Sequence, residues 1–334
     1  MTLSGKFLVS LAVLFSAALC SATVSAQVIT SSKDAEGALS AEFLRNSVEF
    51  YSDSLCEGRS SASRGIIEAG FHIAREFDIE GLVPFGESFS HSFKAGEVTG
   101  HNLIGMLAGK DSHSNKYILV ISHYDGIGVL NGQLYPGADS NASGIAAMTG
   151  IGRMFRYMRD HGREYNCNVI FAALDCNSFN NAGAKELWDE IKSGSLTDPV
   201  SGGRIKAGDI KLVVNMDIIG SSLSPLDSGR EDFLIMLGGN SFRKTLVSAN
   251  DNYNTNLELS FDYYGSKDFT DMFLKRIGDH TVFLDNGMES VLFTSGITMS
   301  TNKTSDTAGT IRYEVLRKRA ILIFHWLERV ISQI

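Results

Sequence analysis

Two apolar runs in the sequence end in side chains that could bind a metal ion or activate a water molecule. The run KYILVISH ends at His123, and Asp125 follows two residues later. The run IKLVVNMD ends at Asp217. A carboxylate beside a histidine can orient the imidazole ring for metal binding. His-X-Asp is not specific by itself, because a histidine that hydrogen-bonds within a turn gives the same pattern.

The stretch PGADSNASG, residues 136–144, also places polar groups at a boundary between expected elements. Its glycines permit tight turns, and Asp139, Ser140 or Asn141 could cap a following helix. A capping turn accounts for the residue types. It does not account for the position of the stretch between the histidine run and a long amphipathic segment.

A third polar turn, ALDCNSFNNAG, occupies residues 173–183. It follows the apolar run NVIFA and precedes the helix-like segment AKELWDEI. The end of a buried strand, before a helix, is a common position for functional groups. Here the central residues Asn177 and Ser178 are neutral, and Asp175 is the only carboxylate of the turn.

The elements that must position these side chains follow from the hydrophobic pattern. Apolar, β-rich runs alternate with helical patterns, which predicts an α/β fold with a mainly parallel sheet covered on both faces. Ligands of such sheets bind at the carboxyl ends of the strands, so we expect His123, Asn177 and Asp217 to lie together. The runs are HNLIGML, KYILVISH, NVIFAALD, IKLVVNMDI, DFLIMLGG and ESVLFTSG, and helical faces are formed by Ile145, Met148, Ile151, Phe155 and Met158 and by Leu316, Ala320, Ile323, Phe324 and Leu327.

The order of these motifs resembles that of the co-catalytic zinc aminopeptidase family, which includes glutamate carboxypeptidases, glutaminyl cyclases and the transferrin receptor ectodomain. The resemblance covers nearly the whole chain after residue 26. It implies a three-layer αβα fold with a mixed, mostly parallel central sheet and two zinc ions at the strand ends. The motifs that carry it are CEGR with AREFDIEGLVP, SHYDGIG, PGADSNASG, NVIFAALDCNS, VVNMDIIG, GDHTVF and KTSDTAGTIRYE.

The resemblance implies that few metal ligands of the family are retained. His123 and Asp217 match the histidine and aspartate that bind one of the two zinc ions. With only these two ligands, we expect no metal or one weakly bound divalent ion. Four further residues match positions that support the site without binding metal, namely Asp125, Asp279, His280 and Asp306.

Four neutral residues occupy positions at which the family has charged or imidazole groups. Ser140 stands at the aspartate that bridges both ions, Asn177 at the general-base glutamate, Ser178 at the glutamate ligand and Asn302 at the late histidine. An asparagine amide cannot deprotonate water. The single-zinc arrangement of the cyclases would need three of the same positions. We therefore expect an impaired or inactive homologue that retains a peptide or small-molecule binding role.

The alternative is an active zinc-dependent aminopeptidase with rearranged ligands. Asp139 directly precedes the bridge position and could turn inward, and His280 is a further candidate. Zinc would then be the cofactor. A hydrolase with a serine nucleophile is disfavoured because the sequence contains no G-X-S-X-G turn.

The N-terminus predicts export. Lys6 precedes an apolar stretch and small residues before Gln27, the pattern of a secretory signal peptide over residues 1–26. The remaining residues, 27–334, are expected to form a single domain in the periplasm or outside the cell, without a transmembrane segment. The net charge of −8 argues against nucleic acid as a partner. The sequence does not indicate an oligomeric state.

Overall fold

The structure is a computed structural model that describes residues 31–111, 114–226 and 228–334. The expected signal peptide, residues 1–26, lies outside the described residues. Within the described part of the chain, no helix has both the length and the apolar character that a membrane crossing requires.

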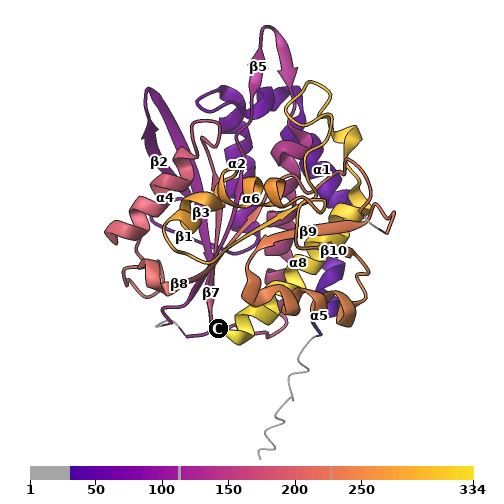
Figure 1. Ribbon diagram of the computed structural model, residues 1–334. Helices are drawn as coiled ribbons and strands as arrows, with labels where there is room; N and C mark the ends of the chain where they lie inside the picture. The colour runs from indigo at the N-terminus through magenta and orange to yellow at the C-terminus, as the bar shows by residue number, and fades with distance from the viewer. Residues whose placement is uncertain (1–30, 112–113, 227) are drawn as a thin grey trace, which may run out of the picture.

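A nine-stranded mixed sheet forms the centre of the molecule (Figure 1). The four strands β7, β4, β8 and β11 lie side by side and parallel, and β3 and β9 flank them in the antiparallel sense. Counting β1, β2 and the central four, six of the nine strands run in one direction. The prediction of a mixed, mostly parallel sheet is confirmed. The sheet strands are β1 (Val83–Pro84), β2 (Ser90–Ala95), β3 (Val98–Leu107), β4 (Tyr117–His123), β7 (Asn168–Leu174), β8 (Ile210–Met216), β9 (Phe233–Gly238), β10 (Glu258–Ser260) and β11 (Ser290–Thr294).

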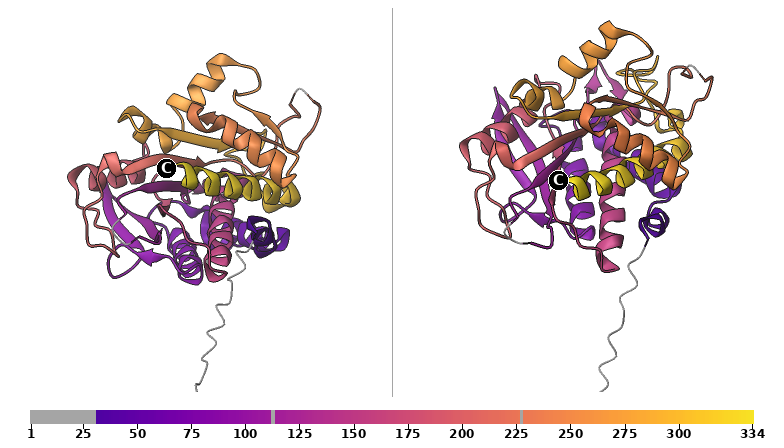
Figure 2. Two further views of the ribbon diagram at one scale, coloured as in Figure 1. Left: turned by 90° about the horizontal axis from the view of Figure 1, so that it is seen from below. Right: turned by 60° about the horizontal axis from the view of Figure 1, so that its bottom comes forward.

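The central strands are apolar because both of their faces are covered. Every residue of β4 and of β7 is buried. One face packs against α2, α3 and α8, with α1 packed on α3 and α8 and α5 packed on α8 (Figure 2). The other face packs against α4 and α7, and α6 lies beside β9. The helices are α1 (Ala41–Ser52), α2 (Arg64–Ile79), α3 (Ser143–Asp160), α4 (Ala182–Ser193), α5 (Arg243–Tyr253), α6 (Lys267–Lys275), α7 (His280–Asp285) and α8 (Tyr313–Gln333).

Short helical turns and a hairpin complete the described structure. The hairpin of β5 (Gly128–Leu130) and β6 (Gln133–Tyr135) projects from the end of the molecule where the parallel strands finish (Figure 1). The turns are η1 (Ser32–Ala38), η2 (Ser54–Arg59), η3 (Ala138–Ala142), η4 (Ala207–Asp209), η5 (Asn240–Phe242) and η6 (Ala308–Thr310).

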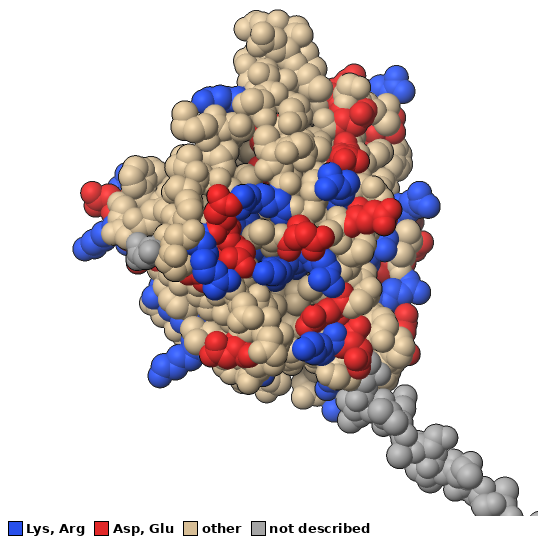
Figure 3. Space-filling view, turned by 90° about the vertical axis from the view of Figure 1, so that its right-hand side faces the viewer, with Lys and Arg blue, Asp and Glu red and all other residues tan. Residues whose placement is uncertain are grey.

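The face shown in Figure 3 carries positive and negative side chains interspersed with one another. The projection at its top bears no charged side chain, in keeping with the uncharged sequence of residues 127–135. This face therefore has no broad patch of one sign.

Candidate functional site: a cleft at the strand ends

A cleft of about 390 Å³ opens at the carboxyl ends of the central strands. His123 is the last residue of β4, Asp217 directly follows β8, and Asn177 lies three residues after β7. Because β7, β4 and β8 are adjacent and parallel, their ends meet, and all three side chains line the cleft. The ends of β4 and β8 and the turn after β7 thus contribute to one cavity.

The other three neutral positions singled out in the sequence line the same cleft. Ser140 comes from η3, Ser178 from the turn after β7 and Asn302 from the loop before η6. Asn177 is the fourth. The structure therefore brings together side chains that are up to 162 residues apart in the sequence.

His123 lies between two carboxylates. Its Nδ1 is 3.1 Å from the carbonyl oxygen and 3.5 Å from the Oδ1 of Asp125, and its Nε2 is 3.5 Å from Oδ1 of Asp217. Burial opposes a charge on the ring, but the two carboxylates outweigh it and raise the pKa of His123 well above its ordinary value. The imidazolium form is favoured at neutral pH.

Asp125 also fixes the turn that carries two of the neutral residues. Its carboxylate oxygens accept hydrogen bonds from the backbone N–H groups of Asn177 (3.0 Å) and Ser178 (3.1 Å). Asp125 lines the cleft but is otherwise buried. It orients both the histidine ring and the turn, which is the supporting position expected from the sequence.

Two neutral side chains contact each other where the resemblance implies a second metal. The Ser140 hydroxyl donates to Oδ1 of Asn302 at 3.0 Å. The Asp306 carboxylate accepts from the backbone N–H groups of Asp139 (2.8 Å) and Ser140 (3.1 Å) and so holds the turn in place. Burial is the main cause that raises the pKa of Asp306 to about 6.

Asp139 does not line the cleft. Its Oδ1 accepts from the Gly220 N–H at 2.7 Å and from the Ser143 hydroxyl at 2.9 Å, and its Oδ2 accepts from the N–H (3.1 Å) and hydroxyl of Ser221. The carboxylate is fully engaged in joining η3 and α3 to the loop after β8. The geometry does not present Asp139 as a substitute metal ligand.

His280 and Asp279 are buried behind the cleft and do not line it. His280 Nε2 lies 3.0 Å from the Leu274 carbonyl, and burial lowers its pKa to about 4. Neither carboxylate oxygen of Asp279 has a hydrogen bond of normal length among the described residues, although the Asn177 side chain is close enough to favour its ionised form. Burial, together with the charges of Asp125 and Asp217, raises the pKa of Asp279 to about 7, and His123 opposes this rise.

The residues of the cleft do not fit a structural or catalytic zinc ion. Two ligands of a tetrahedral zinc at ~2.0–2.1 Å lie about 3.3 Å apart, so the 3.5 Å between His123 and Asp217 suits a shared ion. Such sites have three or four protein ligands. Among the described residues, no group of three or more His, Cys, Asp or Glu side chains is arranged to hold a metal.

One wall of the cleft is apolar. It is formed by residues of α6, by Ile277 just after α6, by β11 and by the loop after β11. The cleft therefore combines hydrogen-bonding groups with a surface for an apolar side chain. The wall residues are Met272, Phe273, Ile277, Leu292 and Ile297.

Two residues of the sequence motifs organise the cleft in ways that their patterns did not disclose. Asn141, considered as a helix cap, does accept from the Gly144 N–H (3.1 Å), but its amide also donates to the Ser122 hydroxyl (2.9 Å) and the Met216 carbonyl (3.0 Å). It thereby ties the ends of β4 and β8 together. Arg59, the arginine of CEGR, is fully buried.

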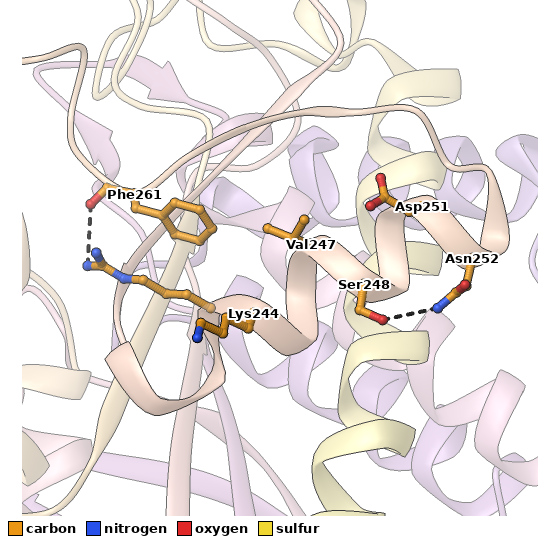
Figure 4. A pocket seen from close by; sticks show the side chains of 7 residues that line it. Lys244, Val247, Ser248, Asp251, Asn252 and Phe261 are labelled. Atoms are coloured by element: carbon orange, nitrogen blue, oxygen red, sulfur yellow. Dashed lines mark hydrogen bonds between the residues drawn. The ribbon is translucent and has the colours of Figure 1, made fainter.

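A separate hollow on the outer surface of α5 shares no residue with the cleft (Figure 4). The Arg243 guanidinium lies over the Phe261 ring, 5.1 Å from its centroid, and donates to the Phe261 carbonyl at 3.5 Å. Ser248 accepts from the Asn252 amide at 3.0 Å. None of its lining residues belongs to the motifs that carry the resemblance.

Comparison with known proteins agrees with this architecture. A sequence model described as "Peptidase family M28" matches residues 102–327. The LapA aminopeptidase of Legionella pneumophila superposes with a TM-score of 0.68 at 14% identity, over 91% of this chain and 76% of that chain. The glutaminyl cyclase of Fimbriiglobus ruber gives 0.67 at 15% identity, over 87% and 95%. These likenesses concern the fold.

Curated relatives match a shorter segment. The BOS complex subunit NCLN of Homo sapiens is 32% identical over 103 residues, which is 29% of this chain and 18% of that protein. The subunit of the same name from Canis lupus familiaris is 33% identical over 103 residues, with the same coverage. The match thus spans less than a fifth of the length of these relatives.

Proposed function

The chain belongs to peptidase family M28, and we propose that it is a non-catalytic member that uses the cleft to bind a peptide or a small molecule. We further propose that it is exported to the periplasm or the cell exterior after loss of residues 1–26. The observation that carries the proposal is the chemistry of one cavity. Ser140, Asn177, Ser178 and Asn302 line it together, and none of them can replace a carboxylate or imidazole ligand.

The absence of a general base supports the same conclusion independently. The Asn177 amide donates to Oδ1 of Asn181 at 3.3 Å and offers no basic atom to a water molecule. Loss of a positioned base typically costs about 10²–10⁴ in rate, and loss of metal ions costs more. A binding role needs neither group.

The shape of the cleft supports a peptide-sized ligand. Its lining includes neutral amides and hydroxyls as well as the apolar wall. Such a surface can hold a backbone amide and an apolar side chain at the same time. The curated relatives are named as subunits of a complex, which is consistent with binding rather than hydrolysis.

Metal analysis of the exported protein tests the proposal directly. After incubation with zinc and removal of free metal, we expect fewer than one zinc ion per chain by plasma mass spectrometry. Close to two ions per chain would overturn the proposal. In parallel, amino-acid anilides with added Zn²⁺, Co²⁺ or Mn²⁺ should show no turnover.

Ligand binding can be tested at the apolar wall. Ile277 in the cleft and Val247 in the hollow on α5 are each 41% exposed, so each accepts a larger side chain at similar cost. Ile277→Trp should abolish binding of peptides with an apolar first residue in equilibrium dialysis, whereas Val247→Trp should leave it unchanged. Equal effects of both variants would argue against the cleft.

The rival function is an active zinc exopeptidase with rearranged ligands. The spacing of His123 and Asp217, which suits a shared ion, is the observation in its favour. Turnover of anilides that is abolished by a chelator and by His123→Ala would establish it.

A further inference from the structure

A second cavity, of about 620 Å³, lies between α2 and the β2–β3 hairpin. It shares no residue with the cleft. Its volume is within the range of pockets that hold drug-sized molecules. We propose that this cavity binds a small organic cation, with an apolar, preferably aromatic body and an ammonium group at one end.

The side of α2 that faces the cavity is a stripe at four-residue spacing: Ile66, Gly70, Ala74 and Asp78. Glycine in the interior of a helix makes the helix less stable than alanine would. Gly70 has no structural need to be glycine, because an added Cβ would come no closer than 3.8 Å to its neighbours, Leu103 and Tyr124. The missing side chain keeps the cavity open at a cost in helix stability.

Two large apolar side chains line the cavity and remain open to solvent. Phe71 is 71% exposed and Ile67 is 51% exposed, although they directly follow Gly70 and Ile66, the two buried residues of the stripe. Apolar surface that is exposed to water is unfavourable, and covering it with a ligand lowers the free energy. Exposed apolar side chains beside a cavity therefore indicate a binding site. An aromatic or alkyl body in the cavity would contact Phe71, Ile67 and Phe89 together.

The negative charge at the rim of the cavity favours a positively charged group at the other end of the ligand. Asp78 on α2 and Glu87 on the segment before β2 are both exposed, and the lining includes no Lys or Arg. Neither carboxylate has a hydrogen bond or ion pair within the described residues. An ammonium group at the rim would therefore meet two unpaired carboxylates, whereas a carboxylate ligand would be repelled.

Two polar side chains of the lining already have hydrogen-bond partners. The Tyr124 hydroxyl donates to the His101 carbonyl at 2.7 Å, and His101 Nδ1 lies 3.3 Å from the Ser90 hydroxyl. The floor thus presents Leu103 and the Tyr124 ring as an apolar surface. Specificity for the cation comes from the rim.

Isothermal titration calorimetry with three probes of equal length tests this assignment. We expect saturable binding of 4-phenylbutylammonium, weaker binding of 4-phenylbutanol, and binding of 4-phenylbutanoate weaker than that of the amine by about tenfold or more. Gly70→Leu fills the cavity and should weaken amine binding at least about tenfold. Ile277→Trp, in the cleft, should have no effect.

The charge is tested by a matched pair of variants. Glu87→Gln should weaken amine binding by about two- to fivefold and leave the alcohol unchanged. Glu97→Gln, at an exposed carboxylate in the turn between β2 and β3 that does not line the cavity, should change neither. If Gly70→Leu lowers the yield of folded protein, Phe71→Ser at the exposed rim tests the same cavity and should also weaken amine binding.

The assignment is overturned if none of the probes binds saturably, or if the three bind equally. It is also overturned if Gly70→Leu and Phe71→Ser leave amine binding intact. Concentration-dependent dimerisation that Gly70→Leu abolishes, without probe binding, would instead assign this face to contact between copies of the chain.

Discussion

At the scale of single residues, the cleft shows how neutral side chains replace a charged set. Ser140 and Asn302 satisfy each other with one hydrogen bond, and Asp125 holds Asn177 and Ser178 by their backbone rather than by their side chains. The neutral residues therefore need no ion to pair with. The charged groups that remain are His123 and the two carboxylates that flank it, Asp125 and Asp217.

Restoring the four positions should restore metal binding. The variant with Ser140→Asp, Asn177→Glu, Ser178→Glu and Asn302→His supplies the bridge, base, ligand and imidazole that the family uses. We expect about two zinc ions per chain by plasma mass spectrometry and measurable hydrolysis of amino-acid anilides.

The matched control carries Asn177→Gln in place of Asn177→Glu with the other three changes. It should bind the same amount of zinc but turn over about 10²–10⁴-fold more slowly, because the base is not a ligand. If the restored variant holds no more zinc than the natural protein, the interpretation of the four positions is incorrect.

Asp279 predicts a pH dependence of stability. Its pKa is about 7 in the folded chain and 3.8 as the ordinary value, so between these values the native state keeps a proton that the unfolded state releases. Stability should fall as pH rises from about 4 to 7, by at most about 1.4 kcal/mol per pH unit. Asp279→Asn should remove this part of the fall.

Urea unfolding at pH 5 and pH 8 measures the effect. Asp279→Asn should be more stable relative to the natural protein at pH 8 than at pH 5. Asp251→Asn, at an exposed carboxylate on α5, should show the same change in stability between pH 5 and pH 8 as the natural protein. If Asp279→Asn also shows the same change in stability between pH 5 and pH 8 as the natural protein, the buried carboxyl does not titrate in this range.

At the scale of elements, Arg59 connects three segments around the cleft. Its guanidinium donates to the carbonyl of Tyr51 at the end of α1, to that of Tyr124 after β4 at 2.9 Å, and to those of Pro136 and Gly137 before η3 at 2.8 Å each. A buried cation with this many carbonyl partners fixes the loops that carry the cleft residues.

Replacing Arg59 should destabilise the fold strongly. Arg59→Met leaves four carbonyls without their donor, and we expect a loss of about 3–5 kcal/mol in the free energy of unfolding. Arg64→Met is the matched control, because Arg64 is exposed and, within the described residues, its one ion pair is with Glu68 at 3.7 Å; it should change stability by less than about 0.5 kcal/mol. A similar small loss for both would contradict a structural role for Arg59.

At the scale of the whole molecule, packing rather than disulfides holds the fold. Hydrophobic clusters on both faces of the sheet supply the core, and the three cysteines of the described chain, Cys56, Cys167 and Cys176, are buried and free. Cys167 and Cys176 lie at the two ends of the extended strand β7, too far apart to form a disulfide with each other.

The thiols should be unreactive in the native protein. Burial raises the pKa of Cys56 to about 11 and those of Cys167 and Cys176 to about 12. Ellman's reagent should label about three thiols per chain in guanidinium and almost none in native buffer, and dithiothreitol should not change the melting temperature. A fourth labelled thiol would show that Cys20 is retained, which would contradict the proposed loss of residues 1–26.

The sequence by itself determined the order of the elements and the positions of the candidate residues along them. Apolar runs specify buried strands, and the residue that ends a parallel strand lies at the sheet edge where the neighbouring strands also end. That local rule was enough to place His123, Asn177 and Asp217 in one cavity. The neutrality of Asn177 and Ser178 was likewise visible from the chain alone.

Only the tertiary structure decided where the side chains point. Asp139 is one residue from Ser140, yet the backbone of η3 directs its carboxylate to Gly220 and Ser221 rather than into the cleft. The Ser140–Asn302 hydrogen bond and the cavity beside α2 likewise join segments that are distant in sequence. Side-chain direction follows from the dihedral angles of a turn and from what packs against it, and neither is encoded in the spacing of residue types.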